Sequence, residues 1–185
     1  MTSRTLHHAT LATALLASTA AGLPVTGTIA INGAVRDLPA GAAFTPAPGV
    51  TVTRGAFTFP DTTMRVTVAG YGDVDITYRL VQTNTSMAEV ARDGVAAMTR
   101  VLARIELLDT TLPLTVIPCA FGPIAIDLAG GGSASGLDLE TASFAIPPAA
   151  PGQCGAVGAR LNALVATANN RLRVHVAGDF SPPAK

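Results

Sequence analysis

Short runs in which apolar and polar residues alternate are the feature that most constrains how this chain can fold. A period of two places the apolar side chains of a strand on one face, and a sheet of such strands buries mainly that face. The runs cover residues 25–31, 34–38, 50–59, 64–69, 73–80, 124–128, 137–146 and 171–176. Because Gly, Pro and Asn residues separate them, the pattern predicts a largely antiparallel sheet joined by turns.

Two hairpins are expected within this sheet. Asn32-Gly33 divides two of the runs, and this dipeptide favours a two-residue turn because both positions tolerate positive φ. The second turn is expected at residues 71–73, which places Val68 opposite Ile76. The same register sets Arg65 opposite Arg79, and this pair of like charges is unfavourable.

Two segments change to the helical period. Ser86 and Glu89 have the spacing of a capping box, and apolar residues then recur at helical spacing. Residues 87–108 are expected to form one long amphipathic helix. A second is expected over residues 153–168. These elements predict an α+β fold with both helices packed on one face of the sheet, and a partial barrel covered by helices has the same pattern.

The start of the chain has the pattern of a secretory leader. Arg4 supplies a positive charge, residues 9–23 contain no charged side chain, and Ala21 fits a cleavage site for small residues. We therefore expect residues 1–21 to be a signal peptide. Residues 22–185 are expected to form a single exported domain with a Pro-rich C-terminal tail, secreted or periplasmic in a bacterium.

The low charge of the chain argues against two kinds of partner. Charged residues make up 13% of the sequence, with twelve basic and twelve acidic side chains, whereas a soluble domain averages about 25%. A net charge of zero offers no basic surface for nucleic acid or for an anionic membrane. No integral membrane span is expected in the mature chain, because charges interrupt every long apolar run.

The two cysteines, Cys119 and Cys154, indicate a disulfide. Two cysteines in an exported chain most simply form one structural bridge. The alternative is a reactive thiol, but the chain has no C-x-x-C motif. His175, the one histidine that would remain after cleavage, lies far along the chain from both.

Charged residues on two expected strands are the polar site candidates. Asp73 and Asp75 occupy alternate positions and could hold a hard cation, although calcium usually needs six or more oxygen ligands. Arg171, Arg173 and His175 also occupy alternate positions. They could bind a carboxylate or an anionic headgroup, or they could form salt bridges on a solvated face.

Common catalytic patterns are missing from the sequence. No serine lies in a G-x-S-x-G motif, and one histidine with two bonded cysteines cannot supply a zinc site. The glycine-rich segment Gly130–Gly136 precedes an expected strand, whereas a phosphate loop precedes a helix. No metal or cofactor is therefore predicted. A hydrolase-type enzyme of unknown substrate remains a hypothesis, ranked third after the two that follow.

Two methionines on the expected long helix motivate the leading functional hypothesis. Met87 and Met98 lie on its apolar stripe, and methionine adapts readily to an irregular apolar pocket. The leading hypothesis is an exported, non-catalytic domain that binds an apolar or amphipathic small molecule, with Arg171, Arg173 or His175 at its polar end. The alternative is a structural or assembly component of the bacterial cell envelope, with an envelope protein as its partner.

Overall fold

The computed structural model describes residues 22–47, 54–87, 89–90 and 97–180, with side chains described everywhere in these ranges except over 86–98. The expected signal peptide and the last residues of the Pro-rich tail lie outside the described residues. Within the described ranges, no helix has the length and the apolar character that crossing a membrane requires.

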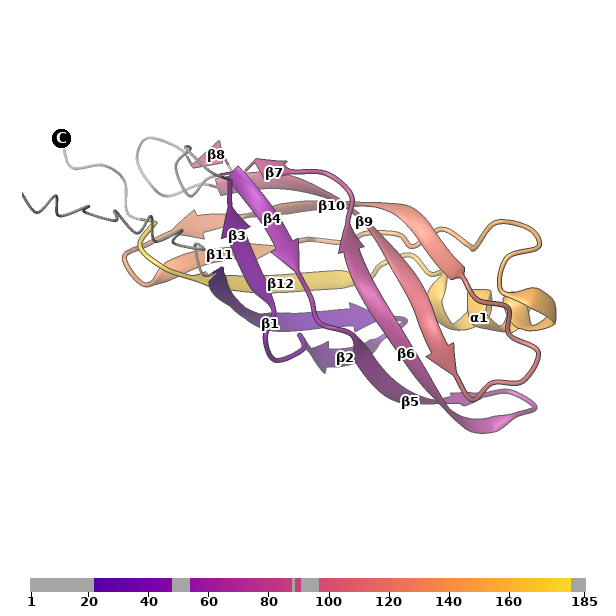
Figure 1. Cartoon of the computed structure of the whole chain (residues 1–185). Helices are drawn as coiled ribbons and strands as arrows, with labels where there is room; N and C mark the ends of the chain where they lie inside the picture. Colours follow the sequence, from indigo (N-terminus) through magenta and orange to yellow (C-terminus); the bar gives the residue numbers. More distant parts are fainter. Residues whose placement is uncertain (1–21, 48–53, 88, 91–96, 181–185) are drawn as a thin grey trace, which may run out of the picture.

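Eight antiparallel strands form a ring that closes on itself (Figure 1). The pairing of β6 with β9 completes the ring. In ring order the strands are β1 (Leu23–Ile31), β3 (Ala43–Pro46), β4 (Arg54–Thr58), β6 (Gly72–Gln82), β9 (Ala97–Thr110), β10 (Cys119–Gly132), β11 (Gly136–Glu140) and β12 (Arg171–Ala177). The short strands β2 (Ala34–Asp37), β5 (Thr62–Val68), β7 (Ser86–Met87) and β8 (Glu89–Val90) pair with β1, β6, β4 and β9, respectively. The expected α+β class is wrong, because the fold is a closed β-barrel.

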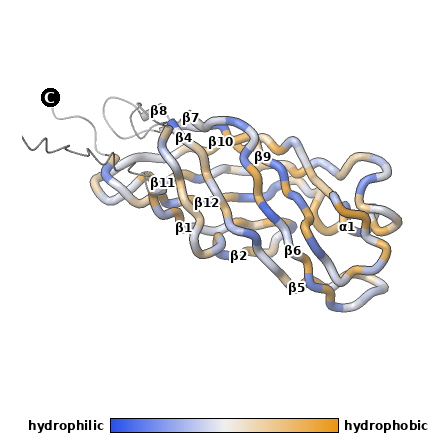
Figure 2. Tube along the Cα trace, in the orientation of Figure 1, coloured by the Kyte–Doolittle hydropathy of each residue, from blue (hydrophilic) through white to orange (hydrophobic). Residues whose placement is uncertain are grey.

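Alternate side chains from the ring strands fill the interior of the barrel. Along β10, Ile124, Ile126 and Leu128 are buried, whereas Ala125 and Asp127 between them are exposed. Figure 2 shows hydrophobic and hydrophilic residues alternating along the strands. Eight strands enclose a space just wide enough for such side chains to fill. The predicted alternation is therefore what builds the core.

The long helix expected over 87–108 is absent. The described residues of this segment form β7, β8 and β9, and β9 lies between β6 and β10 in the ring. Ala103 and Ile105 point into the barrel, and Leu102 is half-buried on the outer face. Its apolar residues recur at helical spacing, but its buried residues also alternate with Arg100, Arg104 and Glu106 on the outer face, so the segment fits both periods. The segment forms a strand because β6 and β10 lie on either side of it and supply hydrogen-bond partners for its backbone.

The second expected helix exists but is shorter than residues 153–168. A 3-10 turn, η1 (Gly155–Val157), leads into helix α1 (Gly158–Val165), which lies at one end of the barrel (Figure 1). Asn169 has φ 63° and follows the helix by a few residues. It adopts the left-handed conformation, but the helix has already ended at Val165.

The register of the β5–β6 hairpin differs from the expected one. Val68 lies opposite Gly72 instead of Ile76, and Arg65 lies opposite Asp75. The guanidinium of Arg65 donates two hydrogen bonds to that carboxylate, at 2.8 and 3.1 Å. The shift removes the unfavourable pairing of Arg65 with Arg79 and moves the turn towards Gly70. An even shift keeps the apolar side chains on the same face.

The first expected hairpin is confirmed. Ile31 lies opposite Ala34, and the turn between them has φ values of 51° at Asn32 and 78° at Gly33. Positive φ at both central residues is the geometry of a type I′ turn, which matches the twist of the flanking strands. The turn thus fixes which residues of β2 share a face with which residues of β1.

Candidate functional site

The wall of the barrel is incomplete between β1 and β6. Near one end β3 and β4 bridge these strands, with β3 paired to β1 at Leu23 and β4 paired to β6 at Val81. Farther along, β1 carries β2 and β6 carries β5, and the described part of the sheet contains no pairing between β2 and β5. The two edge strands, both along the lower side of Figure 1, therefore flank an opening in the wall.

A cavity of about 180 Å³, here called the side pocket, lies at this opening. Its strand residues are mostly apolar: Ile29, Ile31, Ala34, Met64, Val66, Ile76, Ile105 and Leu107. Helix α1 closes it with Leu161, Leu164 and Val165. An engineered apolar cavity of about 150 Å³ binds benzene. The side pocket therefore has room for one ring or a short alkyl chain.

The centre of the barrel offers much less space. The cavity there is about 40 Å³, which is little more than one water molecule occupies in the liquid. Ile29 and Ile105 line both this cavity and the side pocket, so their side chains form the partition between the two. Of these two cavities, only the side pocket therefore has room for a ligand larger than a water molecule.

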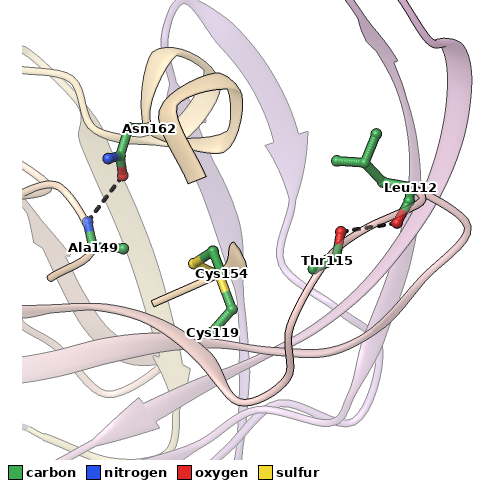
Figure 3. The surroundings of a disulfide bond; sticks show 6 residues. All are labelled: Leu112, Thr115, Cys119, Ala149, Cys154 and Asn162. Atoms are coloured by element: carbon green, nitrogen blue, oxygen red, sulfur yellow. Dashed lines mark hydrogen bonds between the residues drawn. A yellow bond between two sulfur atoms is a disulfide. The ribbon is translucent and has the colours of Figure 1, made fainter. Parts of the chain in front are cut away.

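The predicted disulfide is confirmed, and it attaches the helical segment to the barrel. Cys119 begins β10 and Cys154 precedes η1, with their Cα atoms 4.6 Å apart (Figure 3). Both residues are completely buried. The bridge therefore holds the start of the helical segment that closes the side pocket.

Two further contacts fix helix α1. The side-chain oxygen of Asn162 accepts a hydrogen bond of 2.9 Å from the backbone N–H of Ala149 (Figure 3). On the other side, Arg160 donates to the backbone carbonyl of Ala69, and its guanidinium lies 5.1 Å from the ring centroid of Tyr71. Ala69 and Tyr71 belong to the turn between β5 and β6. The helix is thus connected to the hairpin that forms one side of the opening.

Three polar residues line the otherwise apolar side pocket: Asn32, Arg36 and Tyr78. Arg36 lies opposite Ile29 across the β1–β2 ladder, and directly opposed residues share a face of the sheet. Burial raises the pKa of the half-buried Tyr78 phenol, and the positive charge of Arg36 opposes this rise. The phenol therefore keeps its proton at neutral pH.

The basic residues predicted to meet a ligand lie on the outer face of β12, away from the side pocket. Arg173 forms an ion pair of 2.9 Å with Glu140, and Nδ1 of His175 lies 2.8 Å from a carboxylate oxygen of Asp138. Arg171 is exposed. None of the three basic residues lines the side pocket. The alternative interpretation, paired residues on a solvated face, describes Arg173, and His175 lies within hydrogen-bond distance of Asp138 on the same face.

The methionines predicted to line a pocket lie where side chains are not described. Their backbones belong to strands, with Met87 opposite Arg54 and Met98 opposite Ala129. The expected pocket between the sheet and a helix over 87–108 does not exist, because that segment forms strands.

The two aspartates considered for a cation site have other partners. Asp75 accepts both hydrogen bonds from Arg65, and Asp73 accepts one of 2.7 Å from the Thr67 hydroxyl. Among the described residues, no group of three or more potential metal ligands comes together. The pair belongs to a network of polar contacts across the β5–β6 hairpin.

Exposed arginine–aspartate pairs predict how stability responds to acid. Hydrogen bonds from the arginines hold the pKa of each carboxyl below its usual value of 3.8. The pairs are Arg79–Asp61, Arg65–Asp75 and Arg100–Asp127. A lowered folded pKa contributes stability above pH 3.8 that is lost as the pH falls through the folded pKa. We expect the temperature of the unfolding midpoint to decrease when the pH is lowered below about 4. A midpoint temperature that increases in this pH range would contradict the prediction.

The effect on stability should be modest and salt-dependent. Exposed ion pairs contribute little individually and are screened by salt. The decrease of the unfolding midpoint on acidification should therefore be smaller in about 0.5 M NaCl than in low salt. Asp127→Asn should reduce the acid response without changing the spectrum of the folded protein at neutral pH.

Arg36 and Tyr78 line the side pocket but were not among the residues expected to form a site. Both lie inside segments that were correctly expected to be strands, and a single polar residue in such a strand does not by itself indicate a binding site. The usable signal was the Asn32-Gly33 turn, because its register places Arg36 opposite the apolar Ile29. Arg36 itself is exposed, so it lines the rim of the pocket and keeps contact with solvent.

Comparison with known proteins adds no assignment. No protein-family model, curated protein or solved structure matches this chain. The side pocket is therefore the feature of this chain that points to a function.

Proposed function

We propose that this chain is a non-catalytic binding domain for a small apolar or amphipathic molecule, which it holds in the side pocket. The observation that carries the proposal is a cavity of about 180 Å³ whose lining is apolar except for Asn32, Arg36 and Tyr78. An apolar cavity with a few polar groups is the usual form of a small-molecule site. Transfer of an apolar ligand from water into it contributes about 25 cal/mol for each Å² of apolar surface buried.

The position of the pocket also supports this function. It lies at the opening between β2 and β5, so a ligand can enter without separating paired strands. The partition formed by Ile29 and Ile105 limits how far the ligand can penetrate. The ligand is therefore a compact molecule, about the size of a single ring.

We also propose that the domain acts outside the cytoplasm of a bacterial cell, secreted or periplasmic. The Cys119–Cys154 disulfide supports this, because such bonds persist in oxidising compartments. The leader-like pattern of residues 1–21 supports it independently, and those residues lie outside the described part.

Binding of toluene tests the proposed function directly. Toluene should shift the methyl resonances of Ile31 and Ile76 saturably, because both side chains line the side pocket. The methyl resonances of Ile126 and Ile146 serve as internal controls, because these residues line only the central cavity. NMR titration of isoleucine-methyl-labelled protein measures both groups in one sample. Unchanged Ile31 and Ile76 resonances up to the solubility of toluene would contradict the proposal.

A matched pair of variants extends the test. Ala34→Phe places a ring on the face that lines the pocket and should weaken toluene binding by about tenfold or more, because it occupies ligand volume. Val35→Phe adds the same ring to the next residue of β2, which is 59% exposed and does not line the pocket. Its affinity for toluene should stay within about twofold of the wild type. Equal losses in both variants would point to a general effect on β2.

A further inference from the structure

Arg36 lies on an exposed strand at the rim of an apolar pocket, and within the described residues its guanidinium pairs with no carboxylate, not even that of the adjacent Asp37. Its one hydrogen bond within the described residues is donated by Nη1 to the adjacent carbonyl of Val35, at 3.1 Å, and no ion pair is formed there. By contrast, five other arginines have carboxylate partners: Arg65, Arg79, Arg100, Arg104 and Arg173. Arg36 therefore has most of its five N–H donors available at the pocket.

Tyr78 supplies a second donor from the opposite side of the opening. It belongs to β6, whereas Arg36 belongs to β2, and both line the side pocket. Its hydroxyl has no hydrogen-bond partner among the residues that the structure describes, although the side chain is half-buried. The guanidinium is close enough for its charge to act on the phenol. Two hydrogen-bond donors thus converge on the pocket from two walls.

We propose that the ligand is a small carboxylic acid, whose carboxylate is bound by the guanidinium of Arg36 and the hydroxyl of Tyr78 while its apolar body fills the side pocket. This inference rests on the proposed function and specifies the chemical class of the ligand. A guanidinium matches the two oxygens of a carboxylate in a planar, bidentate arrangement. A phenol that retains its proton can donate a further hydrogen bond to either oxygen.

The apolar walls define the remainder of the ligand. Ile31 and Val66 line the pocket from the two edge strands, and Leu161 lines it from helix α1. These side chains offer no hydrogen bonds, so hydroxyl or amide groups on the body of the ligand would lose their water without a partner. The favoured ligands are therefore single-ring aromatic acids and short-chain acids without further polar groups.

Benzoate, benzamide and toluene separate the two levels of the proposal. The three probes share one ring, and only benzoate carries a charge. We expect the wild-type protein to bind benzoate about tenfold more tightly than benzamide at low salt. Arg36→Gln should remove this preference by weakening benzoate about tenfold, with toluene affinity within about twofold of the wild type. The same NMR titrations of Ile31 and Ile76 measure all three affinities.

Two further variants test the geometry and control for net charge. Tyr78→Phe keeps the ring and removes the hydroxyl, so it should weaken benzoate several-fold and leave toluene unchanged. Arg171→Gln removes a positive charge from the outer face, where Arg171 lies opposite Ala30 of β1. It should leave benzoate affinity within about twofold of the wild type, because it does not line the pocket.

The outcomes are distinguishable. If the protein binds toluene but binds benzoate no more tightly than benzamide, the carboxylic-acid proposal is overturned and the proposed function stands. If Arg36→Gln and Arg171→Gln weaken benzoate equally, the preference reflects net charge, and the assignment to Arg36 is overturned. If no probe shifts Ile31 or Ile76, the proposed function itself fails.

Discussion

Replacing Cys119 and Cys154 together by alanine is expected to lower the free energy of unfolding by about 3–4 kcal/mol. The disulfide joins residues 35 positions apart, and closing a loop of that length removes conformational entropy from the unfolded chain. The joined segment includes β10 and β11, two neighbours in the barrel. Urea denaturation of the variant and the wild type, monitored by far-UV circular dichroism, measures the difference.

The same variant should also bind toluene more weakly, because Cys154 attaches the helical segment that closes the side pocket. Each single alanine variant should lose nearly as much stability as the double variant, since either one opens the loop. A loss below about 1 kcal/mol would contradict the loop-closure argument. In that case the buried contacts of Leu161 would hold helix α1 without the bridge.

Asn170→Ala is expected to cost about 2–4 kcal/mol of stability, because Asn170 is a buried polar connection between separate segments. Only 1% of the residue is exposed. Its side-chain oxygen accepts from the backbone N–H of Asn32 at 3.1 Å and from the Thr167 hydroxyl at 2.8 Å. Its amide nitrogen donates to the carbonyls of Phe144 and Thr167, at 3.2 and 2.7 Å. Alanine leaves a cavity and removes all four interactions.

The adjacent residue provides the control for this prediction. Asn169 is exposed and has positive φ, which glycine adopts freely, so Asn169→Gly should change stability by less than about 0.5 kcal/mol. Thermal and urea denaturation of both variants give the comparison. Because Asn32 lies in the turn beside the side pocket, Asn170→Ala should also alter the Ile31 methyl resonance. Equal stability of the two variants would show that the buried hydrogen bonds contribute little.

Several local features could be predicted from the sequence because their causes are local. The Asn32-Gly33 turn forms since few other residue pairs accept positive φ at both positions. The inward positions of β10 follow from strict alternation. The Cys119–Cys154 bond follows from there being only two cysteines, given an oxidising compartment.

The site could not be predicted in the same way. The expected pocket depended on a helix at 87–108. The apolar residues of β9 fit a helical period as well as a period of two, because Leu102 on the outer face adds to the inward-facing residues such as Ile105. Arg36 and Tyr78 lie more than forty positions apart along the chain, and neither has a neighbour in sequence that indicates a ligand. Only the sheet order brings β2 and β6 to the same cavity.

By itself the sequence determined the strands with strict alternation, the first hairpin turn and the cysteine pair, because each depends on short-range sterics or on composition. The tertiary structure alone decided that β9 is a strand, that the β5–β6 register pairs Arg65 with Asp75, and that the sheet closes. It also decided that β2 and β5 leave an opening, and hence where the side pocket lies. These outcomes depend on which distant strands supply hydrogen-bond partners, and a local pattern of apolar residues contains no information about those partners.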